Sequence, residues 1–588
     1  MTTISKKNRG LQNLSILLQC ITSSLLAAFA VFGIQLWSSG ANVNLIRSMG
    51  AAACAMHEYE IALLQEFAPE SPEELFNRAL LGLGTIIVLM RSSQYMDALK
   101  EKAAAAADQS GPSKRSAKAK PKSVKSLQLR FLPVFWLLRL AFWMSGPYFY
   151  QVYASKVFNG EPATQTIISR IFLVGFGSIA LFGPMMGRLL DTYGRKKGTL
   201  TAALLYTVGA LSTTCDTLSM IFARRAIGGL GTSLLGSAPE AWVVSEAMRG
   251  KSGDASYLSE TFGIAYSYDP VVAIISGQIS GAVAKHRGPT GPFLFLPAFL
   301  VGACLIAIVF WGENKATKAA FPNAEDVSDK DAPKKATVRD GLNIIWQDKK
   351  LLMLGAIQSL FEGSMYIFVS QWPPAMAAAI TKVYGKGAAV PFGTVFSCFM
   401  ACCMIGSSIF TSTSRRGIFL EKQKTKMLML ASASLAFATY IIATTSDVYG
   451  LVLALFVFEG CVGFYFPMMG TMRSKFLPDS HRSVIMSIYG IPLNVFVVTV
   501  FLFMGKLGST GAFAIAALAL LLASVCMLYL RRVRKREAIQ NLKMIRIAFR
   551  QQCNVRIFTN AVSPPRLQRR ESITMQILQQ MRVDLPAC

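Results

Sequence analysis

Long apolar runs separated by short polar stretches recur along most of this chain. Twelve of them follow one another, at 129–155, 163–186, 198–214, 217–247, 258–285, 291–312, 349–378, 388–412, 424–443, 448–472, 482–505 and 509–530. An α-helix needs roughly 20 residues to cross a hydrocarbon core about 30 Å thick, and these runs are close to that length. The pattern predicts an all-α polytopic membrane protein with twelve core spans.

Two more apolar runs come before these twelve, at 11–37 and 76–90. The first is too long for the core of a signal peptide and lacks a clear small-residue cleavage site, so we read it as a retained span. The second is short, and the sequence leaves open whether it crosses the membrane. We therefore expect one or two extra N-terminal transmembrane helices.

A polar insert divides the twelve core runs into six and six, as in a transporter built from two helical bundles. The sequence thus predicts five segments. They are an N-terminal extension with a basic cytosolic linker (1–128), a first six-helix bundle (129–312), a central cytosolic linker (313–348), a second six-helix bundle (349–530) and a basic, partly disordered cytosolic tail suited to anionic lipid (531–588).

The charges of the loops orient the spans. Residues 91–130 hold ten Lys or Arg against three acids, whereas residues 38–75 hold one Arg against six Glu. By the positive-inside rule the first stretch is cytosolic and the second faces outward. The basic cluster at 285–287 falls on the outer side and is an exception. The other basic loops follow the alternation, at 195–197, 413–426 and 473–482.

Composition excludes several classes of function. The 588 residues are 53% hydrophobic and only 16% charged, which is outside the range of soluble domains. The net charge of +28 is spread over the loops, so positive-inside topology explains it better than nucleic-acid binding does. The sequence shows no metal-ligand spacing, no P-loop and no pair of nucleophile and base. We therefore expect no metal site, no cofactor and no enzymatic activity.

The loop between the second and third core spans carries the most specific motif. It reads GRLLDTYGRKKG and matches G-x-L-x-D-x-x-G-R-K-K at every defined position. Gly187 and Gly194 permit a tight turn, and Asp191 can pair with a cation or cap a helix. Arg195 and Lys196 anchor the loop on the cytosolic side. The motif therefore predicts a cytosolic turn between two helix ends.

This loop resembles that of the major facilitator superfamily, in which the motif is thought to gate the cytosolic side. In the fourth core span, Arg225 followed by Gly229 and Gly231 is similar to the superfamily pattern R-x-x-x-G-x-G, where small residues let helices approach closely. The resemblance implies a major facilitator fold of two six-helix bundles and a cytosolic gate at the loop residues named above.

Four phrases narrow the resemblance to the molybdate-anion transporter family. They are SGPYFYQVY (145–153), GGLGTSLLGSAPEAW (228–242), IQSLFEGSMYIFVSQWPPAM (357–376) and EGCVGFYFPMM (459–469). The resemblance covers the core and implies a carrier of a small anion, molybdate in particular. One position departs from the family, which has a carboxylate just before the Trp of the first core helix. Here Phe142 precedes Trp143, so the family's anion site is not carried over to that position.

Several charged residues lie within the apolar runs. At about 1.5 Å of rise per residue, Arg139, Arg225, Glu362 and Glu459 lie roughly 12 to 20 Å deep, near the bilayer midplane. Ionisable residues at such depth are costly and either serve transport or form structural ion pairs, and both readings stay open. Glu240 lies about 22 Å from Arg225 along the fourth span, near the cytosolic face, where we expect a gate or a structural pair.

The buried charges suggest roles in anion transport. Arg suits an oxyanion because its guanidinium binds two oxygens at once, so we predict substrate binding by Arg139 and Arg225. Glu362 or Glu459 would carry a coupling proton, since a carboxyl group in a low dielectric favours its protonated form. The neutral donors that we predict beside the arginines are Ser145, Tyr148 and Gln371.

Three interpretations of function follow. The leading one is a transporter that moves a small anion, by resemblance molybdate, through rocking of two halves in the plasma membrane or, alternatively, in an internal membrane. The second is a major facilitator carrier of a sugar or another organic solute, because one fold hosts many substrates. The third is a membrane sensor or scaffold that transports nothing.

Overall fold

The computed structural model describes residues 69–108, 121–249, 257–314, 338–415, 420–445, 447–478 and 481–560. The apolar run at 11–37, most of the central linker and the end of the tail lie outside this part. The described helices follow the predicted spans. They are α3 (Pro72–Asp108), α4 (Lys122–Ser145), α5 (Phe149–Ala154), α6 (Gln165–Tyr193), α7 (Arg195–Ala210), α8 (Leu218–Arg249), α9 (Leu258–Arg287), α10 (Gly291–Phe310), α11 (Val338–Gln347), α12 (Lys349–Tyr384), α13 (Phe392–Arg415), α14 (Leu420–Thr444), α15 (Val448–Phe476), α16 (Arg482–Leu502) and α17 (Met504–Asn560).

Ten of the described helices are long and apolar enough to cross a membrane, judged by length and composition. They are α3, α4, α6, α10 and α12 to α17. Helix α7 has only 16 residues, and α8 and α9 are richer in small polar and charged residues. In α3 the candidate span covers Pro72–Glu101, so the short apolar run at 76–90 belongs to a helix of spanning length.

Local chemistry fixes where several helices begin and end. Thr164, Asp348 and Asp447 cap α6, α12 and α15, because each side chain accepts a hydrogen bond from a backbone N–H of the first turn. Gly194 ends α6 and precedes α7 with a φ of +112°, a conformation that residues with a Cβ rarely adopt. The turn predicted from GRLLDTYGRKKG is therefore present at the predicted glycine.

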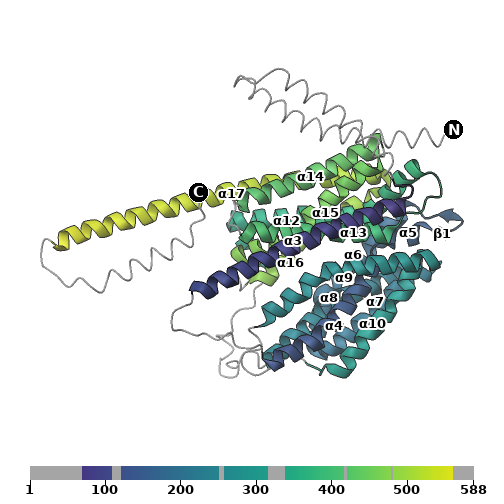
Figure 1. The fold of residues 1–588 in the computed structure, drawn as a ribbon, viewed down its shortest axis with the longest axis horizontal. Helices are drawn as coiled ribbons and strands as arrows, with labels where there is room; N and C mark the ends of the chain where they lie inside the picture. Colours follow the sequence, from purple (N-terminus) through teal and green to yellow (C-terminus); the bar gives the residue numbers. More distant parts are fainter. Residues whose placement is uncertain are drawn as a thin grey trace, which may run out of the picture.

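The helices form two groups that lie one above the other in Figure 1. Helices α4 and α6 to α10 pack among themselves, and so do α12 to α17. Between α5 and α6, a short antiparallel hairpin pairs β1 (Val157–Phe158) with β2 (Glu161–Pro162). Helix α11, inside the predicted central linker, packs on α12 and α16, and α17 continues past the predicted start of the tail to Asn560.

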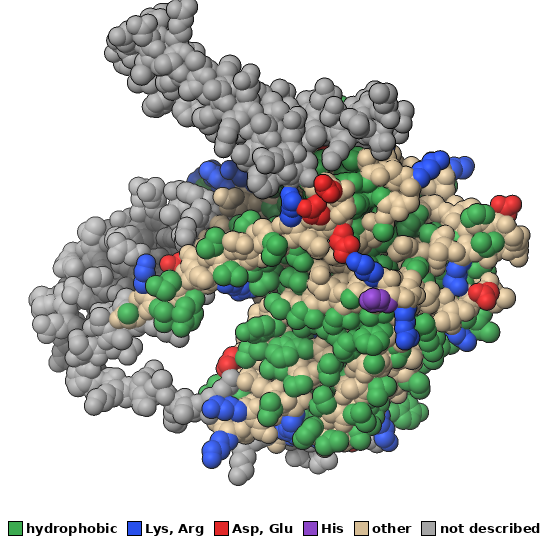
Figure 2. Space-filling model, turned by 45° about the vertical axis from the view of Figure 1, so that its right-hand side comes forward, with side chains coloured by type: hydrophobic (Ala, Val, Ile, Leu, Met, Phe, Trp, Pro, Cys, Tyr) green, Lys and Arg blue, Asp and Glu red, His purple; other side chains and the backbone are tan. Residues whose placement is uncertain are grey.

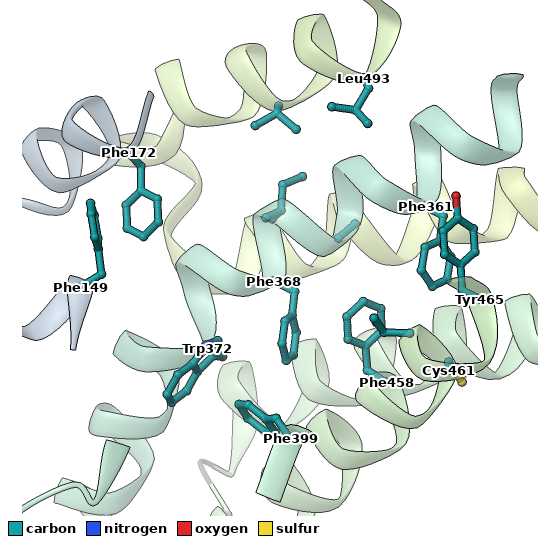
Figure 3. Packing of buried hydrophobic residues seen from close by; sticks show 14 of the residues in the cluster. Phe149, Phe172, Phe361, Phe368, Trp372, Phe399, Phe458, Cys461, Tyr465 and Leu493 are labelled. Carbon is teal, nitrogen blue, oxygen red and sulfur yellow. The ribbon is translucent and has the colours of Figure 1, made fainter. Parts of the chain in front are cut away.

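Aromatic rings fill much of the second group. Phe361 of α12 stacks on Tyr465 of α15 with ring centroids 3.8 Å apart, and Phe368 packs on Phe458 at 4.6 Å. Figure 3 shows these rings between α12 and α15, with Trp372 beside them. Aromatic side chains bury a large apolar area each, so these ring contacts hold α12 against α15.

The two groups touch each other near the ends that the loop charges predict to face outward, called here the outer ends. Helix α9 packs on α13 and α6 packs on α16 and α17. A Cβ on Gly393 would lie 2.2 Å from the carbonyl oxygen of Gly277, so α9 and α13 meet backbone to backbone there. Toward the other end the ribbons of the two groups lie farther apart in Figure 1, and Figure 2 shows a hollow on the left side of the molecule.

Helix α3 lies along the second group and also reaches the first (Figure 1). Phe76 is fully buried, and Gln94 Nε2 donates to the Ser408 carbonyl oxygen on α13 at 3.1 Å. The carboxylate of Glu73 lies 3.3 Å from the Lys285 ammonium on α9. Lys285, an exception to the charge rule, therefore has an acidic partner on α3.

Candidate functional site

Three glycines let α8 approach its neighbours. A Cβ on Gly229 would lie 2.6 Å from the carbonyl oxygen of Gly175 on α6, and one on Gly231 would lie 2.5 Å from the backbone nitrogen of Tyr206 on α7. A Cβ on Gly228 would lie 2.7 Å from the Gly209 Cα. The close packing expected for the R-x-x-x-G-x-G pattern is present, and it holds Arg225 against both helices.

The neighbours of Arg225 are aromatic rings and hydroxyl groups. Its guanidinium carbon is 4.4 Å from the centroid of the Phe149 ring, a cation–π contact. Its charge interacts with the hydroxyl groups of Tyr153 and Tyr206. The buried Nε atom has no hydrogen-bond partner, and none of the described carboxylates pairs with this guanidinium. Arg225 is therefore a cation that the described residues leave uncompensated.

Arg139, in contrast, is bound by a carboxylate. Its Nε and Nη2 atoms donate to the two oxygens of Asp269 on α9 at 2.7 and 2.6 Å. Trp143 Nε1 donates to the same carboxylate at 3.1 Å. This bidentate pair fixes α4 to α9 and supports the structural reading of Arg139. The sequence analysis did not single out Asp269. Its position inside an apolar run, directly before Pro270, could have marked it as a partner for a buried cation.

Ser145 of α4 and Tyr206 of α7 form a pair of hydroxyl groups. The Tyr206 hydroxyl is 2.9 Å from the Ser145 Oγ atom and donates to the Phe142 carbonyl oxygen at 3.3 Å. The charges of both Arg139 and Arg225 interact with Tyr206. The sequence predicted a neutral hydrogen-bond donor at Ser145, and the structure adds the hydroxyl group of Tyr206 beside it. Sequence reasoning passed over Tyr206 because an aromatic residue in an apolar run is usually a packing residue.

Tyr148 and Gln371 lie at the outer contact between the groups. Tyr148 is 5% exposed, and its ring centroid is 5.9 Å from that of Phe392 on α13. Gln371 is fully buried, and its Oε1 atom accepts hydrogen bonds from Ser509 at 3.0 Å and Gln165 at 3.4 Å. Neither side chain hydrogen-bonds to Arg139 or Arg225 in this conformation, so their role at the substrate stays a prediction.

The two acids predicted to carry a proton differ in their surroundings. Glu362 accepts a hydrogen bond from Arg473 Nη2 at 2.7 Å and another from the Tyr465 hydroxyl at 3.1 Å. Glu459 is 5% exposed and has no hydrogen bond or ion pair with a described residue. Nearby are Cys402 and Cys403 of α13, with whose thiols its charge interacts. The structure thus separates a paired acid from an unpaired one.

The predicted cytosolic gate is tied to the segment after α10. Both oxygens of Glu313 accept hydrogen bonds at 3.0 Å from the backbone N–H groups of Lys196 and Lys197, in the first turn of α7. A carboxylate suits this position because a helix N-terminus carries partial positive charge. The Arg195 backbone N–H also donates to the Asn314 carbonyl oxygen at 2.9 Å. Residues 313 and 314 are therefore held on the first group.

The other predicted gate residues lie on α6 and α8. Gly187 is in the last part of α6 with open space beside its Cα, and Asp191 is in the same helix with a side chain outside the described part. Glu240 accepts a short hydrogen bond from the Tyr266 hydroxyl of α9, and its charge interacts with that of Arg139. Among the described residues, no group of three or more His, Cys, Asp or Glu is arranged to hold a metal ion.

Comparison with known proteins gives matches over most of the chain. A family described as sugar transporters with 12 transmembrane segments matches residues 100–465, and the Major Facilitator Superfamily matches residues 374–565. The chain is 27% identical to the molybdate-anion transporter of Takifugu rubripes over 421 residues, which are 68% of this chain and 84% of that one. It is 28% identical to the molybdate-anion transporter of Danio rerio over 387 residues, which are 63% of this chain and 77% of that one.

Solved structures of transporters share the architecture. The POT family transporter PepTSo aligns with a TM-score of 0.56 at 11% identity, covering 71% of this chain and 99% of that one. A D-xylose-proton symporter aligns with a TM-score of 0.51 at 11% identity, covering 69% and 97%. Because such low identity is compatible with different substrates, these likenesses show the fold alone.

Proposed function

The chain belongs to the major facilitator superfamily and is a multi-pass membrane transporter, not an enzyme, and from this premise we propose that it moves a small oxyanion, molybdate in particular, by alternating access. The cargo is inferred from the relatives, which are named molybdate-anion transporters. A gate at the GRLLDTYGRKKG loop and proton coupling through Glu362 or Glu459 belong to the same proposal.

The observation that carries the proposal is the uncompensated charge of Arg225. An oxyanion that leaves water needs fixed cations and donors to replace its hydration shell, and a guanidinium supplies two parallel N–H groups. Arg225 lies beside hydroxyl donors and pairs with none of the described carboxylates. The Nε and Nη2 atoms of Arg139 are already hydrogen-bonded to the two carboxylate oxygens of Asp269. We therefore assign Arg225, with Ser145 and Tyr206, as the anion-binding set.

Uptake of molybdate into proteoliposomes tests the cargo. We expect uptake above that of protein-free vesicles, with inhibition by tungstate and none by hexoses or nucleosides. Inhibition by a sugar instead would favour the second candidate, which the match to a family of sugar transporters supports. Equal uptake with and without the protein, across a panel of oxyanions and sugars, would refute transport of these classes.

Substitutions at Arg225 test the assigned site. Arg225→Ala should lower molybdate uptake by at least about tenfold, since one charge-assisted hydrogen bond is worth about 1.5 kcal/mol or more. Arg225→Lys should recover little of it, because an ammonium cannot bind two oxygens in parallel. Arg170→Lys, at an exposed position of α6, is the matched control and should keep wild-type uptake. Wild-type uptake by Arg225→Ala would remove the assignment.

The location of the protein is part of the proposal. We place the transporter in the plasma membrane, with an internal membrane as the alternative. Surface biotinylation of intact cells separates the two, because only protein in the plasma membrane exposes its outer loops to an impermeant reagent.

A further inference from the structure

The last helix of the second group, α17, continues beyond its membrane span. The candidate span ends at Glu537, and the helix runs on to Asn560. In Figure 1 this part extends past the ends of the other helices. Residues 531–560 are called here the α17 extension. We propose that the extension is a docking helix for an acidic protein with an apolar groove, of the class of calcium-loaded EF-hand proteins. This inference goes beyond transport.

The extension leads away from the bilayer instead of lying along it. Sharp bends in a helix arise at Pro, at Gly or at local insertions, and residues 531–560 contain neither Pro nor Gly. At about 1.5 Å of rise per residue, Arg546, Arg550 and Arg556 lie roughly 14, 20 and 29 Å beyond the end of the candidate span. The Debye length at physiological ionic strength is about 8 Å, so lipid head groups hardly attract these charges.

The extension presents almost only positive charge. It holds nine Lys or Arg against a single acid, Glu537. The carboxylate of that acid lies 3.1 Å from the ammonium of Lys350 in the first turn of α12, so its charge is already compensated. The basic side chains of Arg532, Lys535 and Lys543 are exposed. A basic helix in water is complementary to an acidic protein surface, and such complementarity speeds association and selects the partner.

An apolar row runs beside these charges. Leu542, Ile545 and Phe549 are spaced i, i+3 and i+7, which places the three positions on one face of a helix. Each of them is followed directly by a Lys or Arg, so a basic row runs parallel to the apolar one. The described apolar side chains nearby are uncovered, since Ile539 is 44% exposed and Met544 66% exposed. Apolar residues at this spacing are the anchors by which amphipathic helices enter a groove.

A calcium-loaded EF-hand protein fits both rows. Calcium opens the helix pairs of such sensors and exposes a Met-rich apolar groove, and their calcium loops are rich in carboxylates. Basic amphipathic helices are the segments that these grooves bind. Because the extension continues a spanning helix, docking does not require the costly nucleation of a new helix.

Binding of a calcium-loaded EF-hand pair tests the proposal. The probe is the isolated C-terminal lobe of calmodulin, which has one groove, and the target is the full-length chain in nanodiscs of neutral lipid. Fluorescence anisotropy should show saturable binding with calcium and release by a calcium chelator, because the groove closes without calcium. Higher salt should weaken the binding, since salt screens the attraction between charges.

Substitutions in the two rows test the docking face. Phe549→Ala should weaken binding at least about tenfold, because a buried aromatic anchor carries much of the binding energy. Phe558→Ala is the matched control and should bind as the wild type does, since nine residues are about two and a half helical turns and place it on the opposite face. Replacing the basic row by Lys543→Gln, Arg546→Gln and Arg550→Gln together should weaken binding and flatten its dependence on salt.

Several results would overturn the proposal. They are no binding by the wild-type chain, binding that does not need calcium, and equal loss of binding in the two Phe variants. Binding that is lost when the nanodiscs contain anionic lipid would assign the extension to the membrane surface instead. A dimer in detergent that Phe549→Ala dissociates would assign the face to a second copy of the chain. The assay does not measure uptake, so its failure is distinct from a failure of the proposed transport.

Discussion

Arg139 and Arg225 are the same residue type and are predicted from the sequence to lie at similar depth in the membrane, yet the fold gives them different neighbours. Arg139 faces Asp269, which compensates its charge through two hydrogen bonds. Arg225 faces the Phe149 ring and tyrosine hydroxyl groups, which do not. Removing the carboxylate partner of a buried guanidinium is strongly destabilising, whereas a guanidinium that has no such partner is available to an anion.

The Arg139–Asp269 pair should be a stability element. Arg139→Gln and Asp269→Asn should each lower the free energy of unfolding by about 3 kcal/mol, because each leaves a mostly buried charge without its partner. The double variant should recover much of this loss, since no lone charge remains. Thermal unfolding in detergent measures all three. Single variants that keep wild-type stability but lose uptake would show that Arg139 acts on the substrate instead.

At the residue scale, the sequence located the charged positions but not their partners. The depth of a residue along an apolar run follows from its distance to the ends of the run. The positions of Glu362 and Glu459 near the middle of α12 and α15 could therefore be predicted from the sequence. Whether an acid is paired depends on a residue that is distant in sequence, as Arg473 is from Glu362. Spacing along one helix carries no information about that partner.

At the scale of elements, glycines decide how closely helices pack. Gly228, Gly229 and Gly231 lie on α8 where a Cβ would overlap α6 or α7. Gly194 performs a different task, since its positive φ permits the turn from α6 into α7. One residue type thus serves packing in one element and chain reversal in another.

Gly229→Ala should destabilise the first group. Its Cβ would lie 2.6 Å from a backbone oxygen, which cannot move aside cheaply, and overpacking of this kind costs about 1 to 3 kcal/mol. Gly236→Ala on the same helix is the matched control, because nothing lies within 4 Å of its added Cβ. The control should unfold at or above the wild-type temperature. Equal unfolding temperatures for the two variants would contradict the close packing of α8 on α6.

Most helix boundaries could be predicted from the sequence. Where the structure differs from the prediction, the difference has a physical cause. Helix α3 extends well beyond the apolar run at 76–90, because polar residues continue a helix in water once an apolar segment has formed it. Glu313 and Asn314 were expected to begin a polar linker. The fold instead uses the Glu313 carboxylate at the start of α7, which only the position of α10 beside α7 makes possible.

At the scale of the whole molecule, the two groups are in close contact at the outer ends. Small residues make the outer contact between α9 and α13 tight. Gln165 of α6 and Gln371 of α12 hydrogen-bond across the groups at the same end. Alternating access requires these contacts to separate when the outer side opens.

A covalent link across the outer contact should therefore stop transport. In a variant without native cysteines, Gln165→Cys with Gln371→Cys joined by a short disulfide-forming cross-linker should lose uptake, and reduction should restore it. The reference is the same variant before linking, so effects of the substitutions cancel. Gln128→Cys with Thr261→Cys, two positions that hydrogen-bond at 2.9 Å within the first group, is the matched control and should transport when linked. Unchanged uptake by the linked outer pair would rule out opening at that end.

Hydropathy and motif spacing were enough to establish the class of the protein. The number and length of apolar runs, the polar insert between two sets of six and the motifs GRLLDTYGRKKG and R-x-x-x-G-x-G are local properties, because membrane insertion and close helix packing depend on hydropathy and spacing along the chain. Superfamily and broad activity follow from such features.

Which charges are compensated depends on how helices that are distant along the chain pack together. Asp269 reaches Arg139 from 130 positions away in the chain, and Arg473 reaches Glu362 from 111 positions away, while Arg225 and Glu459 are left without such partners among the described residues. In a low dielectric, the neighbour of a charge determines whether it stabilises the fold or binds an ion. That neighbour is set by how helices cross, which the sequence pattern of a single helix does not encode.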